Sequence, residues 1–109
     1  MARINEQVLQ NITSATTSAT YKYRKRKGHD IIAYSIVAGS LTDGLASGGG
    51  AITGTYVLES AVPGTSAWIT VPDGTFTDTE TSGTFVPGGD MDLRWNCTAY
   101  TTATVVRIG

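Results

Sequence analysis

The chain has 109 residues with a net charge of −1, and only 16% of them are charged. This length fits one domain with a single core and is too short for two. The chain has no run of about 18 apolar residues, so we expect no membrane-spanning helix. The polar start of the chain lacks the apolar core of a secretory signal, and the single Cys97 excludes an intramolecular disulfide, so we expect synthesis in a reducing cytoplasm.

The first segment is predicted to be an arm outside the core. Ile4, Val8 and Ile12 are spaced four residues apart, which is a weak helical pattern. An isolated helix of this length would be marginal in water. Residues 11–20 are low in charge and in bulky apolar side chains, which is typical of an extended or flexible segment. We therefore expect an N-terminal arm over residues 1–19 and a folded domain over residues 20–109.

The remaining segments read as strands joined by tight turns. Tyr21 and Tyr23 alternate with basic residues, which predicts an edge strand with one wet face. Pro63-Gly64 and Pro72-Asp73-Gly74 signal turns, and Gly54 signals a bulge or a close backbone approach. Strands are predicted over residues 20–26, 30–38, 51–60, 67–71, 75–79, 84–86, 91–100 and 102–108.

Seven or eight short strands with turns every 8–12 residues indicate an all-β fold. No long helical pattern interrupts them, which disfavours a parallel βαβ architecture. The expected fold is a small antiparallel β-sandwich or a jelly-roll-like barrel, carrying the N-terminal arm.

The most distinctive sequence feature is a basic cluster after the arm, formed by Lys22, Arg24, Lys25, Arg26 and Lys27. Residues 1–29 hold six basic residues against one acidic, a net charge of +5, whereas residues 30–109 hold two against eight, a net charge of −6. Surfaces of opposite sign can attract copies of the chain or an acidic neighbour. The acidic body disfavours nucleic acid, although basic residues interleaved with tyrosines could track its backbone.

The sequence offers little support for a catalytic or metal-binding site. His29 has no second histidine or cysteine pair at metal-ligand spacing, and Cys97 lies on the apolar face of its strand. The acidic residues follow turns at irregular intervals, unlike a calcium loop or a glycosidase pair. These are Asp73, Asp78, Glu80, Asp90 and Asp92. We expect no enzyme activity, no cofactor and no metal.

Two tryptophans leave an alternative open. Trp68 and Trp95 could form a sugar-stacking platform, but in a domain of this size they more often fill the core. A carbohydrate-binding module would be a monomer with Trp68 or Tyr100 on its surface.

Several stretches together resemble small β-sandwich structural proteins of tailed bacteriophages. They begin at Gly54 (GTYVLES), Trp68 (WITV), Asp73 (DGTFT), Met91 (MDLRWN) and Thr104 (TVVRI). The likeness covers roughly residues 20–109 and is greatest to head decoration, or cement, proteins on the capsid exterior. The resemblance consists of short strands that are rich in Thr and Gly, and it includes no catalytic residue.

The resemblance implies a protein made in the host cytoplasm that forms trimers and bridges capsid subunits on the virion. Its expected partners are the major capsid protein or other virion proteins, with no membrane, and nucleic acid is a disfavoured partner. The basic cluster would meet an acidic capsid or sister-subunit surface. Ile4, Val8 and Ile12 would anchor the arm. A neck, tail or fibre-base location is the alternative within the virion.

Overall fold

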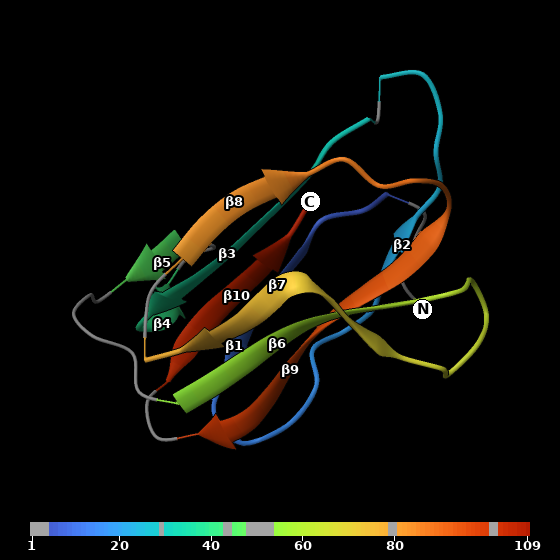
Figure 1. Cartoon of the computed structure of the whole chain (residues 1–109). Coiled ribbons are helices and arrows are strands. Elements are labelled where there is room, and N and C mark those ends of the chain that lie inside the picture. The colour runs from blue at the N-terminus through green and yellow to red at the C-terminus, as the bar shows by residue number, and fades with distance from the viewer. Residues whose placement is uncertain (1–4, 29, 43–44, 48–53, 79–80, 101–102) are drawn as a thin grey trace.

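The computed structural model describes residues 5–28, 30–42, 45–47, 54–78, 81–100 and 103–109. It is an all-β fold in which two four-stranded antiparallel sheets pack face to face (Figure 1). The first sheet has the order β1-β10-β3-β8 and the second β2-β9-β6-β7, with β4 and β5 forming a separate hairpin. The strands are β1 (Val8–Ile12), β2 (Tyr21–Tyr23), β3 (Ile32–Ala38), β4 (Ser40–Thr42), β5 (Leu45–Ser47), β6 (Gly54–Ala61), β7 (Ile69–Thr77), β8 (Thr81–Phe85), β9 (Met91–Tyr100) and β10 (Thr104–Ile108).

Strand pairing follows a single winding rule. Strands of the first half pair with strands of the second half in reverse order: β1 with β10, β2 with β9, β3 with β8 and β6 with β7. Winding this long hairpin adds the pairs β10–β3 and β9–β6. Eight strands arranged in this way form a jelly roll. The expected fold class is confirmed, and the strand order selects the jelly roll among its variants.

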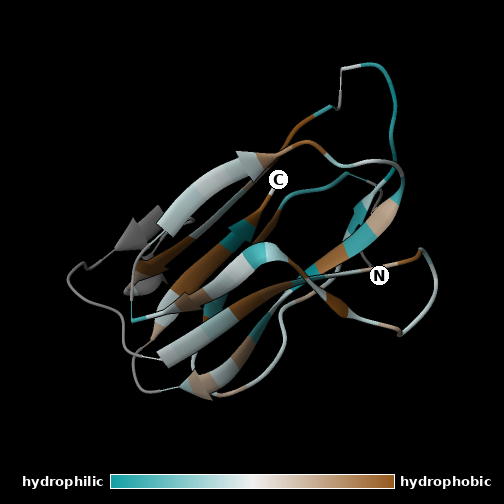
Figure 2. Ribbon diagram, viewed as in Figure 1, coloured by the Kyte–Doolittle hydropathy of each residue, from teal (hydrophilic) through white to brown (hydrophobic). Residues whose placement is uncertain are grey.

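The core lies between the sheets and is centred on β9. Successive side chains of a strand point to opposite faces, so every second residue of β9 points inward. These are the buried residues Leu93, Trp95 and Cys97. The Trp95 ring meets Tyr34 and Phe76 edge-on, with centroids 6.0 and 5.8 Å apart. Aromatic contacts of this geometry stabilise a core beyond the area that they bury. Hydrophobic stretches occur along strands of both sheets (Figure 2), and the buried core residues come from both sheets.

One buried hydroxyl pair also joins the sheets. Thr104 on β10 donates from Oγ1 to the Tyr56 hydroxyl on β6 at 2.6 Å, and both side chains are fully buried. Burial raises the pKa of Tyr56 to about 12, because the phenolate would lose its hydration inside the core. Among the described residues, no buried side-chain nitrogen or oxygen lacks a hydrogen-bond partner.

The N-terminal segment is not the separate arm that the sequence suggested. Val8 to Ile12 form β1, which pairs with β10, and both Val8 and Ile12 are buried in the core. A spacing of four residues is also a multiple of two, so the same pattern fits one face of a strand. Residues 16–18 then run beside β9, where Thr17 bridges Asn96. The expected helical pattern is therefore wrong over the described part, and Ile4 lies outside it.

A second correction concerns Pro72-Asp73-Gly74, which we expected to separate two strands. They lie inside the single strand β7 as a bulge, since Val57 faces Thr75 while Glu59 faces Thr70. Because β7 is an edge strand, a proline without an N–H breaks no interior ladder. The expected turn at Pro63-Gly64 is confirmed, with Thr65 N donating to the Val62 oxygen at 3.0 Å.

Gly54 makes the close approach that its position suggested. It has a φ of 133° and a register shift follows it in the pairing of β6 with β9. A Cβ at this position would collide with the carbonyl oxygen of Ala99. Glycine is therefore required for β6 to enter the sheet.

The position of β1 gives a direct prediction. Ile12→Ala removes a side chain that is 1% exposed in the core, so it should lower the free energy of unfolding by about 2–5 kcal/mol. Leu9→Ala, on the exposed side of the same strand, is the control and should have a much smaller effect. Urea unfolding of both variants measures this. Equal, near-zero losses would mean that β1 is a free arm in solution.

Candidate functional site

One end of the jelly roll gathers three connections, and we call it the loop end. It comprises β2–β3 (residues 24–28 and 30–31), β6–β7 (62–68) and β8–β9 (86–90), on the right of Figure 1. These connections meet because winding the hairpin brings β2, β6 and β8 to finish at the same end. Loops fixed by a rigid scaffold are where binding surfaces usually form.

The basic segment leaves β2 at the loop end. Tyr21 and Tyr23 point into the core as predicted, and burial raises the pKa of Tyr21. Arg24 is held on both sides: its backbone N–H donates to Asn5 Oδ1 at 3.0 Å, and its Nη1 lies 3.2 Å from Asp92 Oδ1. The backbone N–H of Lys25 donates to Asp90 Oδ1 at 2.8 Å. The start of this connection is therefore fixed by side-chain contacts.

Beyond this point the cations are displayed to solvent. Lys25, Arg26 and Lys27 are exposed, and within the described ranges no carboxylate lies within 4 Å of their charged groups. Lys22 is half-buried, and Arg24 already has Asp92 as its partner. Of the predicted cluster, three residues are thus available to a partner.

Asp92 ties two of the connections together. Its carboxylate is only 8% exposed and accepts from Arg24 through Oδ1 and from the backbone N–H of Gly64 through Oδ2, both at 3.2 Å. A buried carboxylate needs such partners, because burial without them would cost several kcal/mol. This residue therefore holds the β2–β3 and β6–β7 connections in a fixed relation.

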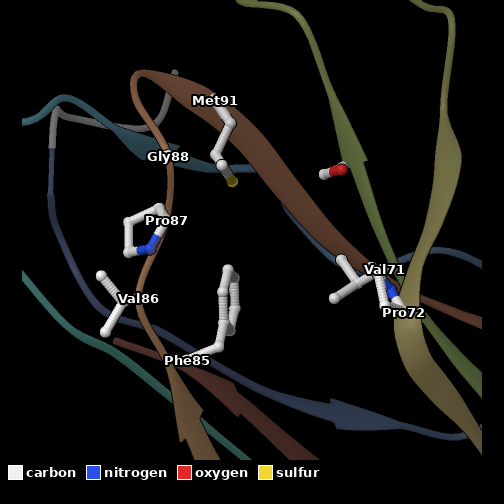
Figure 3. A pocket seen from close by; sticks show the side chains of 8 residues that line it. Val71, Pro72, Phe85, Val86, Pro87, Gly88 and Met91 are labelled. Carbon is white, nitrogen blue, oxygen red and sulfur yellow. The ribbon is translucent and has the colours of Figure 1, made fainter.

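An apolar groove lies at the loop end, and Asp90, which accepts the Lys25 N–H, is part of its lining. Figure 3 shows the first of its two hollows. The hollows have volumes of about 310 and 340 Å³ and share Ser60 and Met91. The first opens between the β7 bulge and the start of the β8–β9 connection, and the second lies against the β6–β7 connection. The first is lined by Val71, Pro72, Phe85, Val86 and Pro87, and the second by Val62, Ala67, Ile69 and Asp90.

Exposed apolar side chains concentrate at this end. Five large ones are exposed among the described residues, and only Leu9 lies elsewhere, on β1. Single exposed apolar residues are ordinary, but a group of them around a groove is typical of an interaction surface. The four at the loop end are Ile31 (62% exposed), Val62 (69%), Ile69 (67%) and Val86 (70%).

The structure places the residues predicted to bind a partner in two different environments. Val8 and Ile12 are core residues and cannot anchor on another protein while the chain is folded. Of the basic residues, Lys22 lies on β2, and a continuous run at the loop end holds Arg24, Lys25, Arg26 and Lys27. Sequence patterns do not indicate the groove, because Val62 adjoins the turn at Pro63-Gly64 and Val86 ends the strand predicted over residues 84–86. The one signal is that each valine directly precedes a proline in a turn, where strand pairing ends.

Residues considered for catalysis have structural partners. Cys97 is buried, as expected, and Asp78 Oδ1 accepts from the backbone N–H of Gly54 at 2.8 Å. Within the described ranges no three His, Cys, Asp or Glu residues gather as metal ligands. His29 and Glu80 lie outside these ranges. The described residues form no helix that is long and apolar enough to cross a membrane.

The two tryptophans have different roles. Trp95 fills the core, as expected, but Trp68 does not: it lies half-buried on the outer side of the second sheet. The Arg94 guanidinium stacks 4.2 Å from the centroid of the Trp68 ring, and Arg94 Nε also donates to Glu59 Oε1 at 2.8 Å. One face of the indole is therefore occupied by a cation that is itself paired.

Comparisons with protein-family models, with curated proteins and with solved structures found no match to this chain. The functional argument therefore depends on the geometry of the loop end.

The role of Asp92 can be tested by substitution. Asp92→Ala leaves the backbone N–H of Gly64 and the Arg24 guanidinium without their partner, so unfolding should require about 1–3 kcal/mol less free energy. Amide hydrogen exchange should also accelerate in residues 24–28 and 62–66. Glu6→Ala, an exposed carboxylate, is the control and should change neither quantity. Unaltered exchange in both connections would contradict the anchoring role.

Proposed function

We propose that this chain is a structural protein of a bacteriophage virion, which decorates the outer surface of the capsid and cements it, and that it is not an enzyme. The observation that carries the proposal is the loop end, where exposed apolar side chains surround a groove. Next to it are three cations that form no ion pair with another described residue. Such a surface suits protein binding, because apolar area supplies affinity and charge supplies selectivity.

The fold supports this proposal by analogy. Jelly rolls recur in viral capsid proteins, although they also occur in lectins and other classes. A rigid two-sheet scaffold with short connections can present one end to a neighbour without losing much conformational entropy on binding. The texture of the strands, which resembles phage decoration proteins, points in the same direction.

The proposed mechanism is stabilisation by mass action. A protein that binds only the assembled shell lowers the free energy of that shell, by about 2.7 kcal/mol per site at a hundred times its Kd. Lys25, Arg26 and Lys27 would meet an acidic surface of the major capsid protein and speed the encounter at low salt. The chain would be made in the host cytoplasm and act on the virion as a homo-oligomer, with a trimer expected.

Three alternative functions can be compared with the geometry of the loop end. A neck, tail or fibre-base location would use the loop end in the same way. A carbohydrate-binding module would need an open aromatic face, but the Trp68 ring is stacked by Arg94, and Tyr100 is half-buried against the core. A nucleic-acid role is disfavoured by the acidic body, which would repel phosphates.

Charge reversal at the basic segment tests the proposal. The Lys25→Glu/Arg26→Glu variant should lose its place on virions, because both side chains would then repel an acidic shell. Arg26→Glu alone should weaken binding, and its matched control is Arg107→Glu, which reverses an exposed cation on β10 in the other sheet. The measurement is occupancy on purified particles of the phage that encodes the chain. Wild-type occupancy by the double variant would refute the role of this segment.

A further inference from the structure

The groove at the loop end has room for inserted side chains. A cavity of about 150 Å³ can hold a benzene molecule, and each hollow has about twice that volume (310 and 340 Å³). Met91 lies between them, and methionine is an unbranched side chain that adapts to what packs against it. Each hollow can therefore take one large apolar side chain from outside.

The chain presents a matching side chain at the same end. Ile31 is 62% exposed and does not line either hollow of its own subunit. Ile32, the next residue, pairs with Phe85, so continuing this antiparallel register by one residue places Ile31 beside Val86. Since Val86 lines the first hollow, the projecting residue and the groove are neighbours on one surface.

The charges around them are complementary as well. Lys25, Arg26 and Lys27 are exposed on one side of Ile31, and Lys25 is hydrogen-bonded to Asp90, which lines the second hollow. Asp30 is an exposed acid directly before Ile31. An incoming Ile31 would therefore bring its own carboxylate towards the basic rim of the groove.

We propose that the occupant of the groove is a second copy of this chain, with Ile31 of one subunit inserted in the first hollow of the next and Asp30 set against its basic segment. Because Ile31 and the groove are neighbours on one surface, each subunit can insert its Ile31 into one neighbour and accept an Ile31 in its own groove. A closed symmetric oligomer requires contacts of this kind. Aliphatic side chains inserted in apolar pockets at the centre of an interface are the kind of contact that dominates association. The inference concerns the chain in solution and does not depend on its location in a virion.

The test is the mass of purified protein by light scattering over a range of concentrations. Wild type should have a mass that is a multiple of 11.4 kDa. Ile31→Ser should associate about tenfold more weakly or worse and approach the mass of one chain. Leu9→Ser replaces the one large exposed apolar side chain outside the loop end and should keep the wild-type mass. Circular dichroism checks that each variant is folded.

A second variant tests the hollow that would accept Ile31. Val86→Ser should weaken association as Ile31→Ser does, because it lines the hollow. An Ile31→Cys chain mixed with a Val86→Cys chain should form a mixed disulfide on mild oxidation, whereas Leu9→Cys mixed with Val86→Cys should not.

A wild-type mass of 11.4 kDa at every concentration up to about 1 mM, where association would be weaker than about 4 kcal/mol, would overturn the proposal. An unchanged oligomer in folded Ile31→Ser would also overturn it. Neither result bears on the Lys25→Glu/Arg26→Glu test of virion binding, which is read on particles.

Discussion

The structure depends on the contacts that Trp95 makes across the interior. Its indole Nε1 donates to the backbone oxygen of Arg107 at 3.1 Å, which joins β9 in one sheet to β10 in the other. Its ring packs edge-on against Tyr34 and Phe76 from two further strands. Its backbone N–H donates to Ser18 Oγ at 2.9 Å, which fixes the segment between β1 and β2. One residue thus joins the two sheets through its side chain and fixes the path of the N-terminal residues through its backbone.

The loop end follows from this arrangement. With β9 held at the centre, its first residues emerge beside the ends of β2 and β6, and Asp92 can anchor both connections. The bulge in β7 moves Val71 and Pro72 away from the regular ladder, opening the side of the sandwich towards Val86. The groove is therefore a consequence of an irregular edge strand on a rigid scaffold. Its apolar lining remains exposed because no described segment of the same chain covers it.

Local patterns predicted most of the fold. The alternation over residues 91–97 and the apolar, β-branched residues over 30–38 are sufficient to locate β9 and β3, since each strand buries residues on one face. The N-terminal strand was mistaken because a four-residue spacing suits a helix and a strand alike, and only pairing with β10 decides between them. The bulge at Pro72 was mistaken for the same reason, because its partner strand β6 is distant in sequence.

The candidate site was only partly predictable. A run of cations is visible in sequence, so the basic segment was found, but the groove assembles from three connections that winding brings together. Proximity of Val62, Val71 and Val86 is a property of the strand order, which sequence patterns do not contain. The same limit explains Val8 and Ile12, whose apolar character was evident but whose partner proved to be the chain's own core.

The central claim is that the loop end is where this molecule meets its partner. Amide hydrogen exchange, compared between dilute and concentrated solutions of the purified chain, tests it most directly. The account predicts that exchange slows with concentration in residues 24–31, 62–72 and 85–91 and is unchanged in β1 and β10. Slowing confined to β1, or to the edge of β8 away from the groove, would contradict it.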